Sequence, residues 1–322
     1  MSIIGKDIEK VVSLLIKGEL VAIPTETVYG LAANGLDENA VLKIYQTKNR
    51  PAFNPLILHT NSIDKVREIV DTFPPNAELL AKTFWPGPLT LVLDKSASVP
   101  EITSAGLNTI AVRIPNHALT LELLSKLPFP LAAPSANASG SISPTMPGHV
   151  EKTLGTKIPY ILDGGNCQIG IESTILKIDK EKVYLLRAGT ISAEEIEEKC
   201  GIKVIKNNID RSIQSPGMLR SHYAPQKKLL AFNREELEEF IKNSKNQEIC
   251  ILAFDTYIDS IPTPNQRLLS VKKDELEAAR NLFNMLHELD EMDSELILAE
   301  FLPEKGIGIA INDKLRRASA NK

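Results

Sequence analysis

Apolar residues near the N-terminus recur three or four positions apart, which is the spacing of one helix face: Ile8, Val11, Val12 and Leu15. Gly18 ends this periodic stretch, and the β-rich run LVAI follows at 20–23. The chain is therefore predicted to open with a helix and then a strand.

The same succession recurs further along the chain. Asp37 is a typical helix N-cap, apolar residues at helical spacing follow it, and PLILH at 55–59 has the composition of a strand. Later apolar runs predict six more strands: 89–94, 109–115, 130–134, 159–164, 173–179 and 183–187. Because helical segments fall between several of these strands, residues 1–206 are predicted to form an α/β domain with a large, twisted, mixed sheet and flanking helices.

The periodic pattern stops near residue 206. The stretch 207–224 combines polar residues with proline and glycine and shows no period, so it is predicted to be a linker. An α/β pattern then resumes in 225–322, which predicts a smaller, Rossmann-like second domain. Its expected strands are 228–232, 248–254 and 295–301, and its expected helices are 234–242, 274–289 and 312–318.

Composition limits the classes of partner. The 37 Lys and Arg residues are outnumbered by 41 Asp and Glu residues, so the net charge of −4 gives no global positive field for nucleic acid or acidic lipid. Cys167, Cys200 and Cys250 are far apart and lack the paired spacing of a zinc or disulfide framework. No apolar run approaches the roughly 18 residues that cross a bilayer. We expect a cytoplasmic protein without a membrane partner.

Familiar nucleotide and hydrolase motifs are absent from the sequence, including GxxxxGK[ST], HExxH, GxSxG and the kinase signature. The two glycines of GIGIA near residue 306 lack the rest of a dinucleotide fingerprint, and a turn before a helix explains them better.

Polar residues instead gather at the ends of apolar strands, where ligands of α/β proteins usually bind. PTETVYGL, directly after LVAI, carries Thr25, Thr27 and Tyr29, although such hydroxyls also commonly cap turns. Lys48 and Arg50 end a predicted helix, where basic residues also complement the helix dipole. Each cluster alone therefore fits an ordinary structural role.

Two further clusters point to an anionic ligand. Arg113 lies inside the apolar strand TIAVRIP, where its charge needs either an internal carboxylate or a substrate carboxylate. The small residues of APSANASGSISPT allow a close backbone approach and supply the polar groups of Ser135, Asn137, Ser143 and Thr145. Cations and neutral donors without a strong base or a cysteine nucleophile favour transfer at a phosphate, in which one substrate attacks another.

Several blocks, taken in order, resemble the YrdC-like family: PTETVYGLAANG, KNRPAFNPLILH, WPGPLTLVL, TIAVRIPNH, LAAPSANASGSISPT and ESTILKI. SPGMLRSHYAP followed by a second α/β unit is similar to the long, two-domain threonylcarbamoyl-AMP synthases of that family. The resemblance covers nearly the whole chain. GIGIAINDKLRRAS follows the family pattern only loosely, which leaves the role of the second domain open.

The resemblance implies a nucleotidyltransferase. L-threonine, bicarbonate and ATP would become L-threonylcarbamoyladenylate, pyrophosphate and water, for the threonylcarbamoyladenosine of tRNA. A threonine carbamate would form first and attack the α-phosphate. Mg²⁺ would be held through the phosphates, without confident protein ligands. The tRNA, or proteins that modify tRNA and accept the adenylate, are further implied partners.

The resemblance also implies the site residues. The core motif is Lys48, Arg50, Ser135 and Asn137. The L-threonine pocket would comprise Thr27, His59, Arg113, the backbone at Ala133, and Ser173. The ATP site would comprise Arg50, Asn54, Thr109, Ser135, Ser143, Arg187 and Tyr223. Since Tyr223 lies in the linker, 207–224 is expected to close over the nucleotide as a lid.

Two other functions share parts of this pattern. A non-catalytic RNA-binding module of the same fold is one, although the net acidity and the lack of interleaved aromatic and basic residues argue against it. A carbamoyl-adenylate former of hydrogenase maturation is the other, but the three scattered cysteines do not supply its zinc fingers.

Overall fold

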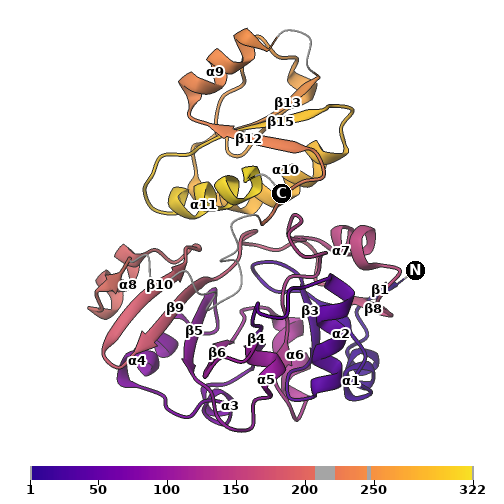
Figure 1. Ribbon diagram of the computed structural model, residues 1–322, viewed down its shortest axis with the longest axis vertical. Coiled ribbons are helices and arrows are strands. Elements are labelled where there is room, and N and C mark those ends of the chain that lie inside the picture. The colour runs from indigo at the N-terminus through magenta and orange to yellow at the C-terminus, as the bar shows by residue number, and fades with distance from the viewer. Residues whose placement is uncertain (1, 207–221, 245–247, 321–322) are drawn as a thin grey trace.

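The computed structural model describes residues 2–206, 222–244 and 248–320, and this part of the chain forms two β-sheets with helices packed around them (Figure 1). One sheet has eleven strands and the other has four. The α/β architecture that the hydrophobic pattern predicts is confirmed. Of the predicted lid, 207–221 lie outside the described residues, and 222–224 are described.

The large sheet is mixed, as predicted. Its strand order is β1-β8-β2-β3-β7-β4-β6-β5-β9-β10-β11. Within it, β4 pairs in parallel with β6 and antiparallel with β7. The strand bounds are Ile3–Gly5 (β1), Val21–Ile23 (β2), Gly30–Asn34 (β3), Ile57–His59 (β4), Leu89–Asp94 (β5), Thr109–Arg113 (β6), Leu131–Ala132 (β7), Tyr160–Leu162 (β8), Thr174–Asp179 (β9), Lys182–Arg187 (β10) and Val204–Ile205 (β11).

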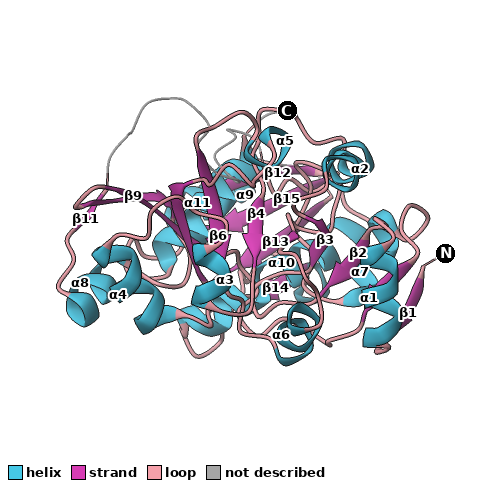
Figure 2. Ribbon diagram, turned by 90° about the horizontal axis from the view of Figure 1, so that it is seen from below, coloured by secondary structure: helices cyan, strands magenta, loops and turns pink. Residues whose placement is uncertain are grey.

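Helices cover both faces of this sheet (Figure 2). They are Ile8–Ile16 (α1), Glu38–Lys48 (α2), Ile63–Arg67 (α3), Pro75–Phe84 (α4), Glu101–Ser104 (α5), Ala118–Ser125 (α6), Pro147–Leu154 (α7) and Ala193–Cys200 (α8). Successive side chains of a strand point to opposite faces. Accordingly, Leu31 and Ala33 of β3 pack in one apolar cluster and Ala32 packs in another. Asp37 caps α2 as predicted and accepts hydrogen bonds from the N–H groups of Asn39 and Ala40.

The second sheet is entirely parallel, with strand order β12-β15-β13-β14. Its elements are Lys228–Phe232 (β12), Arg234–Asn243 (α9), Ile249–Ala253 (β13), Thr263–Asn265 (a 3-10 turn), Gln266–Leu268 (β14), Glu275–Glu291 (α10), Leu296–Glu300 (β15) and Gly308–Ser319 (α11). A parallel sheet with crossover helices agrees with the predicted Rossmann-like unit. Among the described residues, no helix combines the length and the apolar character that a bilayer span requires.

Several details differ from the expected elements, and the strands β1 and β11 were not predicted. After β2 the chain forms a turn and then re-enters the same sheet as β3, Gly30–Asn34, which is antiparallel to β2. Its glycine and alanines have low strand propensity, so the return has no strong local signal. The strand expected at 130–134 shortens to Leu131–Ala132, and β14 was not predicted. The last helix begins at Gly308 and not at 312, so part of the expected turn is helical.

The two sheets are joined by a shared apolar cluster. Val28, Ile142 and Ile171 from the first part of the chain lie in the same buried cluster as Phe283 of α10 and Ile311 of α11. Figure 1 shows α10 and α11 facing the loops of the large sheet. This contact places α11 close to the loops that carry the polar clusters.

Candidate active site

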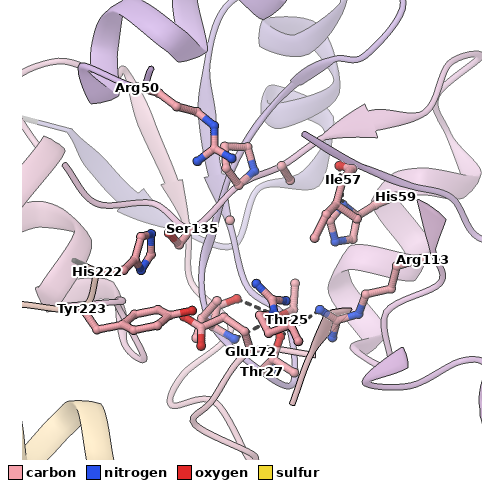
Figure 3. Close-up of a pocket in the computed structure, with 15 residues that line it drawn as sticks. Thr25, Thr27, Arg50, Ile57, His59, Arg113, Ser135, Glu172, His222 and Tyr223 are labelled. Carbon is pink, nitrogen blue, oxygen red and sulfur yellow. Dashed lines mark hydrogen bonds between the residues drawn. The ribbon is translucent and has the colours of Figure 1, made fainter. Parts of the chain in front are cut away.

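His59 and Arg113 lie side by side because β4 and β6 are neighbouring parallel strands. The register pairs His59 directly with Arg113 at the carboxyl end of each strand. Both side chains are buried and both line one pocket (Figure 3). Burial, assisted by the nearby Arg113 charge, lowers the pKa of His59 to about 3, so the imidazole is neutral and its Nδ1 donates to the Ile57 carbonyl.

The Arg113 guanidinium is held by three partners. Its Nε donates to the Gly87 carbonyl at 3.2 Å, its Nη1 to Thr27 Oγ1 at 3.0 Å, and its Nη2 lies 2.8 Å from Glu26 Oε1. The internal ion pair that the sequence left open is therefore present. An anion entering the pocket would meet a guanidinium with a fixed orientation.

Thr25 shapes the turn that presents Thr27. Its hydroxyl accepts hydrogen bonds from the N–H groups of Thr27 and Val28 and donates to the Val28 carbonyl. This is the turn-capping role that threonine hydroxyls commonly play. Thr25 also lines the pocket, so the turn and the pocket wall are the same structure.

Arg50 lies at another side of the same pocket, in the loop after α2 (Figure 3). Its Nε and Nη2 donate to the Asn54 carbonyl, to Asn54 Oδ1 at 2.8 Å and to the Pro55 carbonyl. Burial lowers the pKa of Arg50 to about 10, so the side chain keeps its charge at neutral pH. The hydrogen bonds with Asn54 thus fix the orientation of the Arg50 guanidinium.

Lys48 supports the loop that follows β7. Its ammonium donates to the backbone carbonyls of Ser135 and Asn137. The side chain is 1% exposed, and burial lowers the pKa of Lys48 well below its usual value. Lys48 is not among the lining residues, whereas Ser135 is. In this arrangement Lys48 acts on the pocket through the backbone that it holds.

The motif ESTI joins the pocket to β9. Arg187 donates through Nε to the Ser173 carbonyl and through Nη2 to Ser173 Oγ at 3.0 Å. Ser143 donates to Glu172 Oε1 at 2.5 Å. Arg187 and Glu172 line the pocket, while Ser173 and Ser143 are fully buried behind them.

The described end of the linker also reaches the pocket. His222 and Tyr223 line it, and Tyr223 packs against Phe283 of α10 with ring centroids 5.4 Å apart. The Tyr223 backbone has φ 65°, the left-handed conformation that non-glycine residues rarely adopt. Tyr223 thus lies between the pocket and α10.

These segments enclose one hollow of about 530 Å³, open solvent at its mouth included. Arg50, Arg113 and Ser135 all face it, although they come from different loops and strands (Figure 3). These three residues, which the sequence analysis assigns to the threonine and ATP sites, therefore face one pocket.

Most of the residues expected at the site line this hollow: Thr27, His59, Arg113, Ala133, Arg50, Ser135, Arg187 and Tyr223. The others are not among the lining residues: Lys48, Asn54, Thr109, Asn137, Ser143 and Ser173. Asn54, Ser143 and Ser173 each form a hydrogen bond with a lining residue. Thr109 begins β6, at the opposite end of that strand from Arg113.

Two charged or ionisable lining residues were not predicted, Glu172 and His222. Glu172 directly precedes Ser173 at the entry to β9, and His222 directly precedes Tyr223. Their positions next to predicted site residues could therefore have indicated that Glu172 and His222 lie at the pocket. Nothing in the local pattern indicates that a carboxylate would face a pocket for an anionic ligand.

Two family models match the chain. The model described as "Telomere recombination", which covers Sua5, YciO and YrdC proteins, matches residues 13–189. The model described as "Threonylcarbamoyl-AMP synthase, C-terminal domain" matches residues 191–320. The chain belongs to the threonylcarbamoyl-AMP synthase family.

Members of the threonylcarbamoyl-AMP synthase family align along almost the full chain. A protein of that name from Pyrococcus abyssi is 42% identical over 315 residues, covering 94% of this chain and 91% of the relative. The Bacillus subtilis protein of that name is 38% identical over 324 residues, covering 98% and 93%. The structure of P. abyssi Sua5 complexed with L-threonine superposes with a TM-score of 0.89 at 39% identity, covering 99% of this chain and 97% of that one.

The family models divide the chain earlier than the predicted domains do. The boundary between the two family models falls at residue 190, whereas the predicted first domain runs to residue 206. In the structure, α8 and β11 follow residue 190, and β11 pairs with β10 of the large sheet. By sheet membership, the chain up to Ile205 belongs with the first domain of this threonylcarbamoyl-AMP synthase family member. The predicted limits 1–206, 207–224 and 225–322 stay a prediction.

Proposed function

We propose that the chain is an L-threonylcarbamoyladenylate synthase, a nucleotidyltransferase that converts L-threonine, bicarbonate and ATP into threonylcarbamoyl-AMP, pyrophosphate and water. The product would supply the threonylcarbamoyladenosine modification of tRNA. The observation that carries the proposal is the single pocket in which Arg113 and Arg50 face different parts of the same hollow. Its support is the family membership and the P. abyssi relative that is complexed with L-threonine.

Arg113, His59 and Thr27 form the side of the pocket suited to the amino acid. The guanidinium would bind the threonine carboxylate, since Arg offers a bidentate fork to such a group. The neutral His59 ring adds no second cation beside it. The backbone at Ala133 would border the amino acid as well, because Ala133 lines the same hollow.

The side of the pocket suited to ATP is formed by Arg50, Arg187, Ser135 and Tyr223. Two guanidinium groups would neutralise the triphosphate, and hydrogen bonds with Asn54 and Ser173 orient them. Ser143 would act through Glu172, whose carboxylate it binds. Lys48 and Asn137 would hold the Ser135 loop against the nucleotide.

The chemistry needs little from the protein beyond positioning. The threonine amine would attack the carbon of bicarbonate, and water would leave as the carbamate forms. A carbamate oxygen would then attack the α-phosphorus of ATP, and the bond to the bridging oxygen would break to release pyrophosphate. Fixed cations lower the barrier to such a step because negative charge shifts to the leaving group.

Mg²⁺ is part of the proposal. Among the described residues, Glu172 is the one acidic residue in the pocket lining, and no cluster of three His, Cys, Asp or Glu residues able to hold a metal occurs there. A Mg²⁺ that arrives with ATP would therefore be bound mainly by phosphate oxygens and water, the ligands it commonly keeps. Its contribution would be to neutralise the phosphates. A cytoplasmic location and tRNA-modifying partner proteins belong to the proposal too.

The test is to incubate the purified protein with ATP, Mg²⁺ and bicarbonate, with and without L-threonine. We expect pyrophosphate and the mixed anhydride only when threonine is present. The K48A/R50A double variant should remain folded and form no product, and an exposed pair such as K305A/K273A serves as the matched control. Threonine-independent pyrophosphate release, or RNA binding without ATP consumption, would contradict the proposal.

A further inference from the structure

A lysine of the second domain reaches the wall of the pocket in the first domain. Lys314 lies on α11, is 1% exposed, and its Nζ is 4.0 Å from Glu172 Oε2. That separation is too long for a direct hydrogen bond but short for two opposite charges. Figure 1 shows α11 against the loops of the large sheet.

Glu172 has one oxygen occupied and one without a hydrogen bond. Oε1 accepts the Ser143 hydroxyl at 2.5 Å, whereas Oε2 has no hydrogen-bond partner among the described residues. The side chain is 8% exposed and lines the pocket, where Tyr223 points toward it (Figure 3). A buried carboxylate needs a compensating charge, and Lys314 supplies it.

Lys314 is held in place from several directions. Its Nζ donates to the Ala188 carbonyl at 3.0 Å, which belongs to the segment after β10, and to the Ala310 carbonyl of α11. The same nitrogen lies 5.8 Å from the centroid of the Tyr223 ring. The ammonium therefore stands where the second domain, the linker and the first domain meet.

We propose that Lys314 is a positioning residue of the active site, through which the second domain compensates the charge of Glu172 and keeps the Glu172–Ser143 hydrogen bond in place beside the nucleotide. An uncompensated carboxylate in the pocket would repel the phosphates of ATP. With Lys314 present, the carboxylate can orient Ser143 without adding net charge. This inference rests on the proposed function for the identity of the nucleotide.

The K314M variant tests the proposal because methionine keeps most of the length of lysine and removes its charge. We expect the KM for ATP to rise about tenfold or more, a usual size for coupling between two sites. The KM for L-threonine should change less than about twofold, since Arg113 lies elsewhere in the pocket. An unaltered KM for ATP would overturn the proposal.

The E172Q/K314M double variant separates a charge effect from a packing effect. If Lys314 acts through Glu172, neutralising both residues removes the unpaired charge, and the KM for ATP should recover most of the loss. A double variant no better than K314M would overturn the proposal. If K314M unfolds, the same comparison is made on the thermal midpoint, and the double variant should have the higher one. K305M, an exposed lysine of the same domain, is the matched control.

Binding of α,β-methylene-ATP with Mg²⁺, followed by calorimetry, distinguishes this inference from the proposed function. The analogue cannot release pyrophosphate, so its dissociation constant does not depend on turnover. We expect K314M to weaken binding about tenfold and E172Q/K314M to restore it. If the wild-type chain binds the analogue but forms no threonylcarbamoyl-AMP, the proposed function fails while the role of Lys314 stands. If product forms and K314M binds the analogue as tightly as the wild-type chain does, the proposed function stands and the role of Lys314 fails.

Discussion

Glu26 and Arg113 form a buried ion pair behind the pocket, with Glu26 Oε1 2.8 Å from Arg113 Nη2 and both side chains at most 5% exposed. The carboxylate comes from the turn after β2 and the guanidinium from the end of β6, so the pair joins two segments far apart in the sequence. Because Nη1 is bound to Thr27 at the same time, the guanidinium is oriented before any ligand arrives.

Replacing Arg113 by alanine should weaken threonine capture and destabilise the fold. A charge-assisted hydrogen bond contributes about 1.5 to 3 kcal/mol, so the KM for L-threonine should rise about 10- to 100-fold while the KM for ATP changes little. The variant also leaves Glu26 buried without its partner, which costs about 3 to 5 kcal/mol. Steady-state kinetics with each substrate varied in turn, and urea unfolding, measure the two effects.

The double variant E26Q/R113A separates stability from binding. It should regain part of the lost free energy of unfolding, because the unpaired carboxylate is gone, and still bind threonine poorly, because the guanidinium is absent. A double variant that regains threonine affinity would mean that Arg113 does not contact the amino acid.

Replacing Lys48 by methionine should act on the nucleotide through the Ser135 loop. The substitution removes the donor from two buried carbonyls, and each unsatisfied group costs about 1 to 3 kcal/mol. We expect a loss of product formation and a lower thermal midpoint. Lys43, on the same helix but 42% exposed, gives the matched control K43M, which should behave as wild type.

The contrast between kcat and stability decides the role of Lys48. If K48M keeps the wild-type thermal midpoint and loses all turnover, the ammonium contacts the substrates and does not merely hold the loop. If it loses stability and keeps turnover, the Ser135 loop is not part of the catalytic site.

The local apolar pattern predicts the strands that carry His59 and Arg113, whereas the assignment of both residues to one pocket comes from the family resemblance. The same local logic finds the Asp37 cap and three of the four strands that the structure describes in the second domain. Such predictions depend on residues a few positions apart, whose spacing fixes which face of an element they occupy. They succeed wherever the element is long and regular.

Long-range order is what the local pattern does not specify. That β7 lies between β3 and β4, and so brings Ser135 to the same pocket as Arg50, depends on pairings between distant segments. Lys314 looks like an ordinary helix residue in sequence, and its burial against Glu172 follows only from how α11 packs on the first domain. Tyr223 was found by resemblance, since no propensity predicts its left-handed backbone.

Removing residues 207–322 should abolish or strongly reduce synthesis. The truncation deletes His222 and Tyr223 from the pocket wall and exposes Val28, Ile142 and Ile171, which share an apolar cluster with the second domain. We expect the first domain to remain folded, because its own core clusters are separate. Product formation and circular dichroism check the two points, and unchanged turnover would count against a lid.

His149 and His287 stack across the boundary between the two domains. Their ring centroids are 3.9 Å apart, with His149 on α7 and His287 on α10. His149 Nδ1 accepts from the Thr145 N–H, and His287 Nε2 donates to the Ser143 carbonyl. Lys152 of α7 and Glu291 of α10 form a more exposed ion pair across the same boundary. Protonation of either imidazole would place a positive charge in a buried stack.

The pH dependence of stability should reflect this stack. Burial, followed by the charges of His287 and Lys152, lowers the pKa of His149 to about 3, and burial lowers the pKa of His287 as well. The unfolded chain has a histidine pKa of about 6.5 and binds protons first as the pH falls. The stability that the neutral histidine pair contributes is therefore fully present above about pH 6.5, and it declines as the pH falls toward about 3.

Thermal unfolding measured from pH 8 to pH 5 checks this prediction. The wild-type midpoint should fall more steeply below about pH 6.5 than that of H149Q/H287Q, in which neither position titrates. The three other histidines remain in both proteins, so the difference between the two curves isolates the stacked pair. Curves that stay parallel over this range would mean that the imidazoles take up protons equally in the folded and unfolded chain.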